Sequence, residues 1–249
     1  VRAPGWRTPS SPSTCISPPP QRAHGRPEVP PPVVRQLCGW ESPGEIPSEP
    51  TFSRAFDQFA QDQLPQQIHA PRVKTHAGAK LVGHVSRDAT AIEAPERPAA
   101  KPAPPRRLAL QPARTLAEKL ADLPVRSNAG GKRNSKGHQE SWIGYKLPLD
   151  TVDGDFPVSA GLTSASLPDS PGAIPLAQLT APRVTSLYDL RDRADDAPQI
   201  HAFSQSLGHV PIIDPNPRGG EKLPLAPAEA QRFKERSASE RVNRLLKER

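Results

Sequence analysis

The segment RVTSLYDLRDRADDAPQIHAFSQSLGHVPIIDP (residues 183–215) decides the fold. Its first apolar run, residues 184–189, is typical of a strand, and the following DDAPQIHAFSQSLG carries apolar residues at near-helical spacing. Gly208 is a typical helix stop, and HVPIIDP is a second apolar run. A strand, a helix and a strand in this order imply two parallel strands joined by a crossover. We therefore predict an α/β protein.

The segments upstream extend this sheet. KLVGHVSRDATAIEA (80–94) predicts a short strand that delivers Asp88 near its end. Residues 141–166 predict a hairpin that turns at Asp153 and Gly154, although Pro148 in its first strand cannot donate to a ladder. A further short element covers residues 175–179. The expected order is strand, insertion, hairpin, strand, helix, strand, helix, which favours a mixed sheet with helices packed on it.

Residues 97–140 form a basic insertion. Within residues 97–138, ten Lys or Arg stand against two acids, a net charge of +8. This segment is either a solvated linker or a phosphate-contacting one, and Lys132 and Arg133 are its candidates for DNA contact. Residues 115–123 predict two helical turns, and Gly130-Gly131 with KRNSKGH predict a mobile loop.

The N-terminal part divides in two. Residues 1–34 contain ten prolines, which predicts a disordered Pro-rich tail. Residues 35–79 predict a small helical region with Ser48 as an N-cap, followed by an apolar stripe at i, i+4 and i+7 (Phe52, Phe56 and Phe59). This region is either a helix-turn-helix that contacts DNA, with Arg54 as a contact residue, or a plain helical subdomain.

Composition narrows the class of protein. Pro and Gly supply 34 and 16 of the 249 residues, so we expect a packed core from only part of the chain. A net charge of +7 favours nucleic acid as partner. Two cysteines without ligand spacing argue against a zinc site and fit a reducing cytoplasm. No apolar run approaches a membrane span, so no membrane is expected.

The C-terminal stretch RFKERSASERVNRLLK (232–247) predicts one amphipathic helix. Arg236 and Lys247 lie four residues before and seven after Glu240, so all three share one side of a helix. A carboxylate among cations on a packed helix is one way to build a metal or phosphate site. The same pattern also describes an ordinary solvated helix.

Several blocks together resemble the DDE transposases of bacterial insertion sequences, in the group with a Tyr-x2-Arg-x3-Glu-x6-Lys signature. Phe233, Arg236, Glu240 and Lys247 fill that signature, with Phe in place of Tyr. The resemblance runs from about residue 35 to the end. The other blocks are SRDATAIEA (86–94), GYKLPLD (144–150), PVSAGLTSASLPDS (157–170), LYDLRDRADDAPQI (187–200) and GHVPIIDPNPRGGEK (208–222).

This resemblance implies a ribonuclease H-like catalytic domain over residues 80–249. Its catalytic and metal-binding acids would be Asp88, Asp192 and Glu240, with Asp189 as a competitor for the second position. They would bind two Mg²⁺ (or Mn²⁺) ions and support in-line attack on a phosphodiester. Arg236 and Lys247 would meet DNA phosphates. The implied partners are the DNA of the element ends and target, with a homodimer as the form of an active copy.

The sequence also departs from the family pattern. Asp195 stands where the family has Tyr, Pro148 stands where it commonly has His, and the chain stops two residues after Lys247. These departures imply a truncated or degenerate copy with weak or absent activity. Two alternatives therefore stay open: a catalytically inactive DNA-binding remnant, and a largely disordered product of a decayed reading frame.

Overall fold

The computed structural model describes residues 32–78, 80–94, 96–99, 108, 111, 113–133, 138–217, 220–221 and 223–247. The chain divides into two compact units, residues 1–67 and residues 68–249. The division falls within helix α3 (Leu64–His76). The predicted tail lies mostly outside the described residues, but its last three residues begin helix α1 instead (Pro32–Leu37). Proline is tolerated in the first turn of a helix, which explains this correction.

The first unit is a set of short helices without a deep core. Helix α1 is followed by the 3₁₀-helix η1 (Pro43–Glu45) and by α2 (Glu49–Gln61). Ser48 is the N-cap residue of α2, as predicted, although its side chain makes no capping hydrogen bond. Phe52 packs edge-to-face on Trp40 at 5.9 Å between ring centroids. No described residue from 33 to 67 is fully buried, so this unit has little apolar burial of its own.

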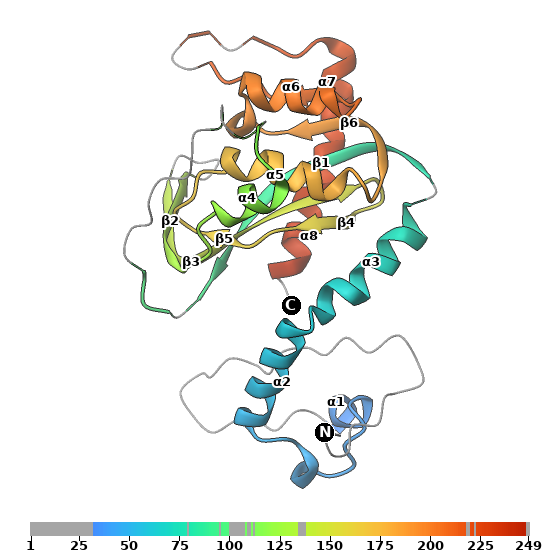
Figure 1. Ribbon diagram of the computed structural model, residues 1–249, viewed down its shortest axis with the longest axis vertical. Coiled ribbons are helices and arrows are strands. Elements are labelled where there is room, and N and C mark those ends of the chain that lie inside the picture. The colour runs from blue at the N-terminus through green and yellow to red at the C-terminus, as the bar shows by residue number, and fades with distance from the viewer. Residues whose placement is uncertain are drawn as a thin grey trace. The chain divides into compact units, whose positions relative to one another are not determined.

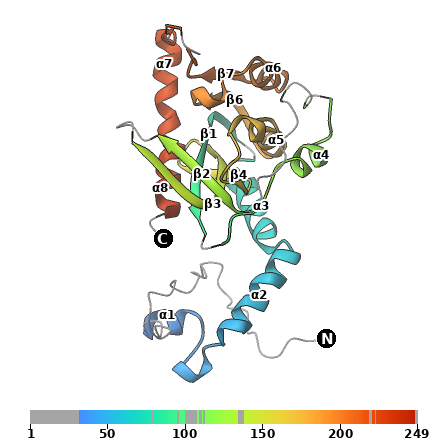
Figure 2. The ribbon, with the colours of Figure 1, turned by 90° about the vertical axis from the view of Figure 1, so that its left-hand side faces the viewer.

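The second unit is built on a mixed sheet, which confirms the predicted α/β class. The order along the main path is β2-β3-β1-β6-β7, and β4 and β5 also pair with β3 (Figure 1, with β7 labelled in Figure 2). Strand β1 runs antiparallel to β3 and parallel to β6, which is parallel to β7. The strands are β1 (Leu81–Glu93), β2 (Asn128–Arg133), β3 (Gln139–Val152), β4 (Phe156–Ala160), β5 (Thr163–Ser164), β6 (Thr185–Arg191) and β7 (Val210–Ile213).

Helices cover both faces of this sheet. Figure 2 shows α7 and α8 along one face, and α4, α5 and α6 on the other. The helices are α4 (Leu116–Ala121), α5 (Ser170–Thr180), η3 (Arg193–Asp195), α6 (Pro198–Ser206), α7 (Pro227–Phe233), η4 (Lys234–Arg236) and α8 (Ser237–Lys247). The apolar core is a Val-rich cluster that joins α3 to β1, β3 and β4, together with an Ile-rich cluster between α5, α6 and β7.

Three sequence-based elements need correction. Strand β1 continues five residues beyond Asp88, because DATAIE pairs with β3 from Asp88↔Leu149 to Glu93↔Gly144. Residues 130–133 of the predicted mobile loop (130–138) belong to strand β2, and residues 134–137 of that loop lie outside the described residues. A Cβ at Gly130 would lie 2.7 Å from the Ala165 carbonyl oxygen, so the glycine permits close packing that a loop would not need. The single C-terminal helix is divided by the 3₁₀ turn η4.

Helix α5 was missed by the sequence reasoning, because two prolines and a glycine lie within it. Pro175 cannot donate to the carbonyl of Pro171 four residues earlier. The side-chain amide of Gln111 donates to that carbonyl instead, at 2.9 Å. A residue of the basic insertion thus satisfies the acceptor that the proline leaves open.

Other predicted elements are present as expected. The hairpin of β3 and β4 turns at Asp153 and Gly154, and Gly154 has a φ of +83°. Helix α4 has a complete capping box between Thr115 and Glu118. Helix α6 is followed by Gly208 at a φ of +80°. None of the helices in the described part of the chain is long and apolar enough to cross a membrane.

Candidate active site

Asp88 lies on β1, just beyond the point where β1 and β6 stop pairing. Strand β6 pairs with β1 only as far as Ser86↔Leu190, so Asp88 is the second residue beyond that pairing. Side chains alternate along a strand, and Ser86 and Asp88 therefore point to the same face. The Ser86 hydroxyl donates to the Glu235 carbonyl in η4 at 3.4 Å. Asp88 accordingly faces the C-terminal helices.

Two side chains of those helices contact the Asp88 carboxylate. The Asn243 amide donates to Oδ2 at 2.9 Å, and the Arg236 Nη1 lies 3.7 Å from Oδ1. The Nη2 of Arg236 also donates to Glu240 Oε1 at 2.6 Å. One guanidinium therefore bridges a carboxylate of the central strand and a carboxylate of α8.

Asp192 approaches the same edge from β6. It is the first residue after that strand, and its Oδ1 accepts from the Ala194 amide at 2.9 Å as the cap of η3. Burial raises the pKa of Asp88, while Arg236 and the Asn243 hydrogen bond oppose the rise. The negative charge of Asp192 adds to it. Asp88 and Asp192 are therefore close enough to interact electrostatically.

The structure does not gather the three acids into a tight cluster. Within the described residues, no group of three or more His, Cys, Asp or Glu side chains is arranged to hold a metal ion. The Glu240 side chain is 57% exposed and turned towards Arg236. Asp189, the competing second acid, is buried against Arg191 on the other face of the sheet and takes no part in this site.

The residues predicted to contact DNA lie on different elements. Lys247 is exposed at the end of α8, two helical turns beyond Glu240 and hence about 10 Å along the helix axis. Lys132 in β2 forms a partly exposed ion pair with Glu140 at 3.5 Å. Arg133 ends the same strand, and its side chain lies outside the described residues. Arg54 is exposed on α2, in the first unit.

A partly exposed ion pair joins α8 to the β3–β4 turn. Arg241 donates through Nε and Nη2 to the two oxygens of Asp155, each at 2.7 Å. The hydrogen bond from Arg241 holds the pKa of the Asp155 carboxyl below its ordinary value. Asp155 lies in the β3–β4 turn with a φ of +60°. The turn thus presents its carboxylate to the helix that carries Glu240 and Asn243.

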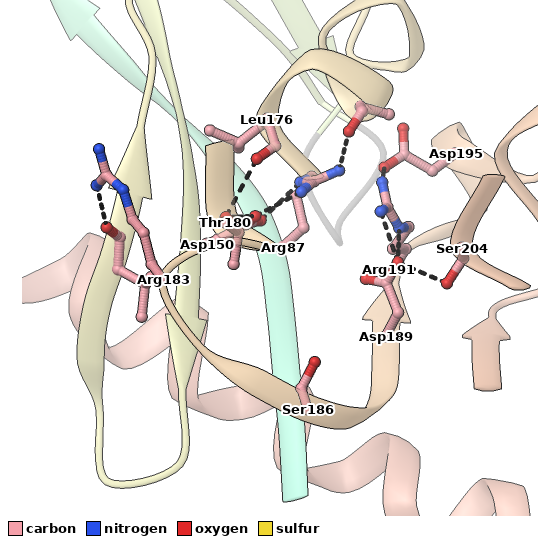
Figure 3. Close-up of polar contacts among 12 residues, drawn as sticks. Arg87, Asp150, Leu176, Thr180, Arg183, Ser186, Asp189, Arg191, Asp195 and Ser204 are labelled. Carbon is pink, nitrogen blue, oxygen red and sulfur yellow. Dashed lines mark hydrogen bonds and ion pairs between the residues drawn. The ribbon is translucent and has the colours of Figure 1, made fainter. Parts of the chain in front are cut away.

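A buried polar layer lies on the opposite face, beneath the site (Figure 3). The residue before Asp88 is Arg87, which donates to both oxygens of Asp150 at 2.7 and 2.5 Å. Arg87 also donates to the Ala173 carbonyl of α5, and Thr180 donates to Asp150 at 2.5 Å. This network ties β1 and β3 to α5.

A second buried arginine precedes Asp192. Arg191 donates to Asp189 at 2.6 Å and lies 3.4 Å from Asp195 (Figure 3). Burial alone would raise the pKa of Asp189, but Arg191 and Arg87 hold it below its ordinary value. Burial raises the pKa of Asp195 to about 6, although Arg191 and Arg87 pull in the opposite direction. Asp195 thus lies in the interior of the second unit.

Sequence reasoning missed Asn243 and both buried arginines. Asn243 belongs to no motif, and its spacing of three residues from Glu240 was the available signal. The arginines could have been found from the repeated Arg-Asp pairs at positions 87–88 and 191–192, because adjacent residues of a strand face opposite sides.

Comparisons with protein-family models, curated proteins and solved structures found no match to this chain.

Proposed function

We propose that this protein is a DDE-type polynucleotidyl transferase with a ribonuclease H-like fold, related to insertion-sequence transposases and acting on DNA. The observation that carries the proposal is that Arg236 contacts both Asp88 and Glu240, while the charge of Asp192 reaches Asp88 and contributes to its raised pKa. The sheet supports it as well, because the central strand has an antiparallel hairpin on one side and two parallel strands on the other.

The donor set suits Mg²⁺ or Mn²⁺. Asp88, Asp192 and Glu240 would offer hard carboxylate oxygens, and Mg²⁺ needs few protein ligands because it keeps several waters. The Glu240 side chain is largely exposed and is held by its ion pair with Arg236, so a change of rotamer can turn its carboxylate towards Asp88. When bound, a pair of such ions would activate the attacking oxygen and stabilise the leaving oxygen of the phosphodiester.

The residues of the chain have distinct roles in this proposal. Arg236 now neutralises Asp88 and Glu240, and a guanidinium in this position also suits a phosphate oxygen of the substrate. Asp155 and Arg241 hold α8 against the hairpin. Arg87 and Arg191 hold β1 and β6 in place from the opposite face of the sheet. The backbone at Asp88 and Asp192 therefore does not shift when metal ions or DNA phosphates bind to the carboxylates.

Cleavage of labelled duplex DNA in Mg²⁺ or Mn²⁺ tests the proposal. Asp192→Asn and Glu240→Gln should lose cleavage and retain DNA binding. Glu235→Gln is the matched control, because it removes one exposed acid from the neighbouring turn η4. Cleavage that survives in Asp192→Asn, or that falls equally in Glu235→Gln, would refute the site.

A catalytically inactive DNA-binding remnant is the second candidate function. Arg236 already satisfies two of the three proposed acids, and no described group of three ligands is preformed, which favours this alternative. It predicts duplex binding that weakens steeply with salt and no cleavage in any metal. Absence of both binding and cleavage would exclude both candidates.

A further inference from the structure

Asn243 is buried on a helix whose following residues are exposed. Its exposed fraction is 6%, whereas residues 244–247 of α8 are exposed. Asparagine is a weak helix former, and a buried amide costs free energy unless its polar atoms are paired. An aliphatic residue would pack between α8 and β1 at a lower cost. The amide therefore needs a reason beyond packing.

The contacts of this amide point to Asp88. Its Nδ2 donates to Oδ2 of Asp88 at 2.9 Å, while Arg236 stands 3.7 Å from Oδ1, beyond hydrogen-bond range. The two oxygens of Asp88 therefore differ: Oδ2 accepts a directional hydrogen bond from Asn243, whereas Oδ1 faces the Arg236 guanidinium at ion-pair distance only. The Oδ1 of Asn243 is itself buried without a hydrogen-bond partner within the described residues.

We propose that Asn243 is a positioning residue that fixes the Asp88 carboxylate by binding Oδ2, so that Oδ1 is presented to the edge shared with Asp192 and Glu240. The proposal rests on the proposed function, and it assigns a role to a residue outside the signature of Phe233, Arg236, Glu240 and Lys247. Asn243 lies one turn beyond Glu240, so the same helix carries one proposed ligand and orients another.

The first test is the affinity for Mn²⁺, measured by calorimetry without DNA. Asn243→Leu should weaken binding about tenfold or more, the range seen when a residue that orients a metal ligand is removed. Gln111→Leu is the matched control, because it also removes a buried side-chain amide with a hydrogen bond to the protein, made here to Pro171 of α5 on the opposite face of the sheet from Asp88. Equal affinities in Asn243→Leu and the wild type, or an equal loss in Gln111→Leu, would overturn the proposal.

A second variant keeps the test decisive if Asn243→Leu does not fold. Asn243→Asp has the same shape, but an ionised Asp only accepts hydrogen bonds and cannot donate to Oδ2 of Asp88, so the affinity for Mn²⁺ should again fall about tenfold. Unchanged or higher affinity in this variant would mean that the hydrogen bond to Oδ2 does not position Asp88, and the proposal would fail.

A spectroscopic measurement separates this proposal from the proposed function. The side-chain amide resonance of Asn243 should shift when Asp88→Ala removes its acceptor, and that of Gln111 should not. If the wild-type protein binds no divalent ion and cuts no DNA, the proposed function fails even where this shift is seen. If the wild type binds Mn²⁺ and the amide resonance is insensitive to Asp88→Ala, the positioning role fails and the proposed function stands.

Discussion

Replacing Asp195 with Asn should make the protein more stable at neutral pH. Asp195 has 3% of its surface exposed, and the nearest guanidinium, Arg191, is shared with Asp189 at the shorter distance of 2.6 Å. Although the Arg191–Asp195 distance suggests an ion pair, burial outweighs this attraction and raises the pKa of Asp195 to about 6. Asn has the same shape as the protonated acid but carries no ionisable group, so it stays neutral at every pH.

The magnitude follows from the change in pKa between the unfolded and folded states. A rise from 3.8 to about 6 corresponds to about 3 kcal/mol, at 1.36 kcal/mol per unit. Because the folded-state pKa is the higher one, the folded protein binds the proton more tightly. The resulting stability is complete below pH 3.8 and is lost as the pH rises through about 6. Wild type should therefore lose about 2 kcal/mol relative to Asp195→Asn between pH 4 and pH 7, which is most of the full effect.

Urea denaturation of both proteins across this pH range tests the reasoning. At each pH the free energy of unfolding of Asp195→Asn is subtracted from that of wild type. Contributions from groups that titrate alike in both proteins cancel in this difference. Asp189→Asn is the control of opposite sign, because the pKa of Asp189 is lowered in the folded state. Its carboxylate stabilises the fold at neutral pH, and this stability is lost as the pH falls. A difference for Asp195→Asn that stays flat with pH would refute the burial argument.

Two other substitutions probe the packing around the site. Arg87→Met leaves the buried Asp150 unpaired and should lower the free energy of unfolding by about 3–5 kcal/mol, whereas Arg87→Met combined with Asp150→Leu should recover most of the loss in urea denaturation. A double variant no better than the single one would contradict the pairing. Gly130→Ala should cost about 1–3 kcal/mol in thermal unfolding, because its Cβ would lie 2.7 Å from neighbouring atoms. In Gly131→Ala the nearest neighbour of that Cβ, the Glu140 carbonyl oxygen, is 3.5 Å away, so this control should change stability by about 0.5 kcal/mol or less.

The sheet was predictable where apolar runs and turn residues agree. The segment of residues 183–215 has a clear apolar period and a glycine stop, and β6, α6 and β7 follow it closely. Asp153 and Gly154 marked the hairpin turn because such a pair accepts the backbone conformation that a tight turn needs. These elements depend on local chemistry that a sequence displays.

The elements that failed depend on distant partners. Helix α5 contains Pro171 and Pro175, which argue against a helix unless another residue satisfies the freed carbonyl, and Gln111 lies 60 residues away from it in the chain. Strand β2 contains two glycines that suggest a loop until the packing against Gly130 is known. In both cases a tertiary contact overrides the local preference.

The candidate site shows the same division. The helical spacing of Arg236 and Glu240 was enough to predict that they meet, and they form a hydrogen bond of 2.6 Å. Spacing placed Lys247 on the same side, but not near the acids. That Asp88 meets Asn243 depends on how α8 crosses β1, and no local pattern encodes a contact across 155 residues.

The bond from Gln111 to Pro171 changes how the basic insertion should be regarded. Leu108 packs against the Ile-rich cluster and Lys119 donates to Gln178 at 2.9 Å, so the segment reaches α5 at more than one point. The described residues of this segment therefore pack into the interior of the second unit, and the segment is not a removable appendage. A shortened chain without this segment would leave α5 with an open carbonyl and an uncovered flank. We therefore expect a deletion of this segment to be tolerated only if position 175 also carries a helix-forming residue, whose backbone N–H can donate to the Pro171 carbonyl.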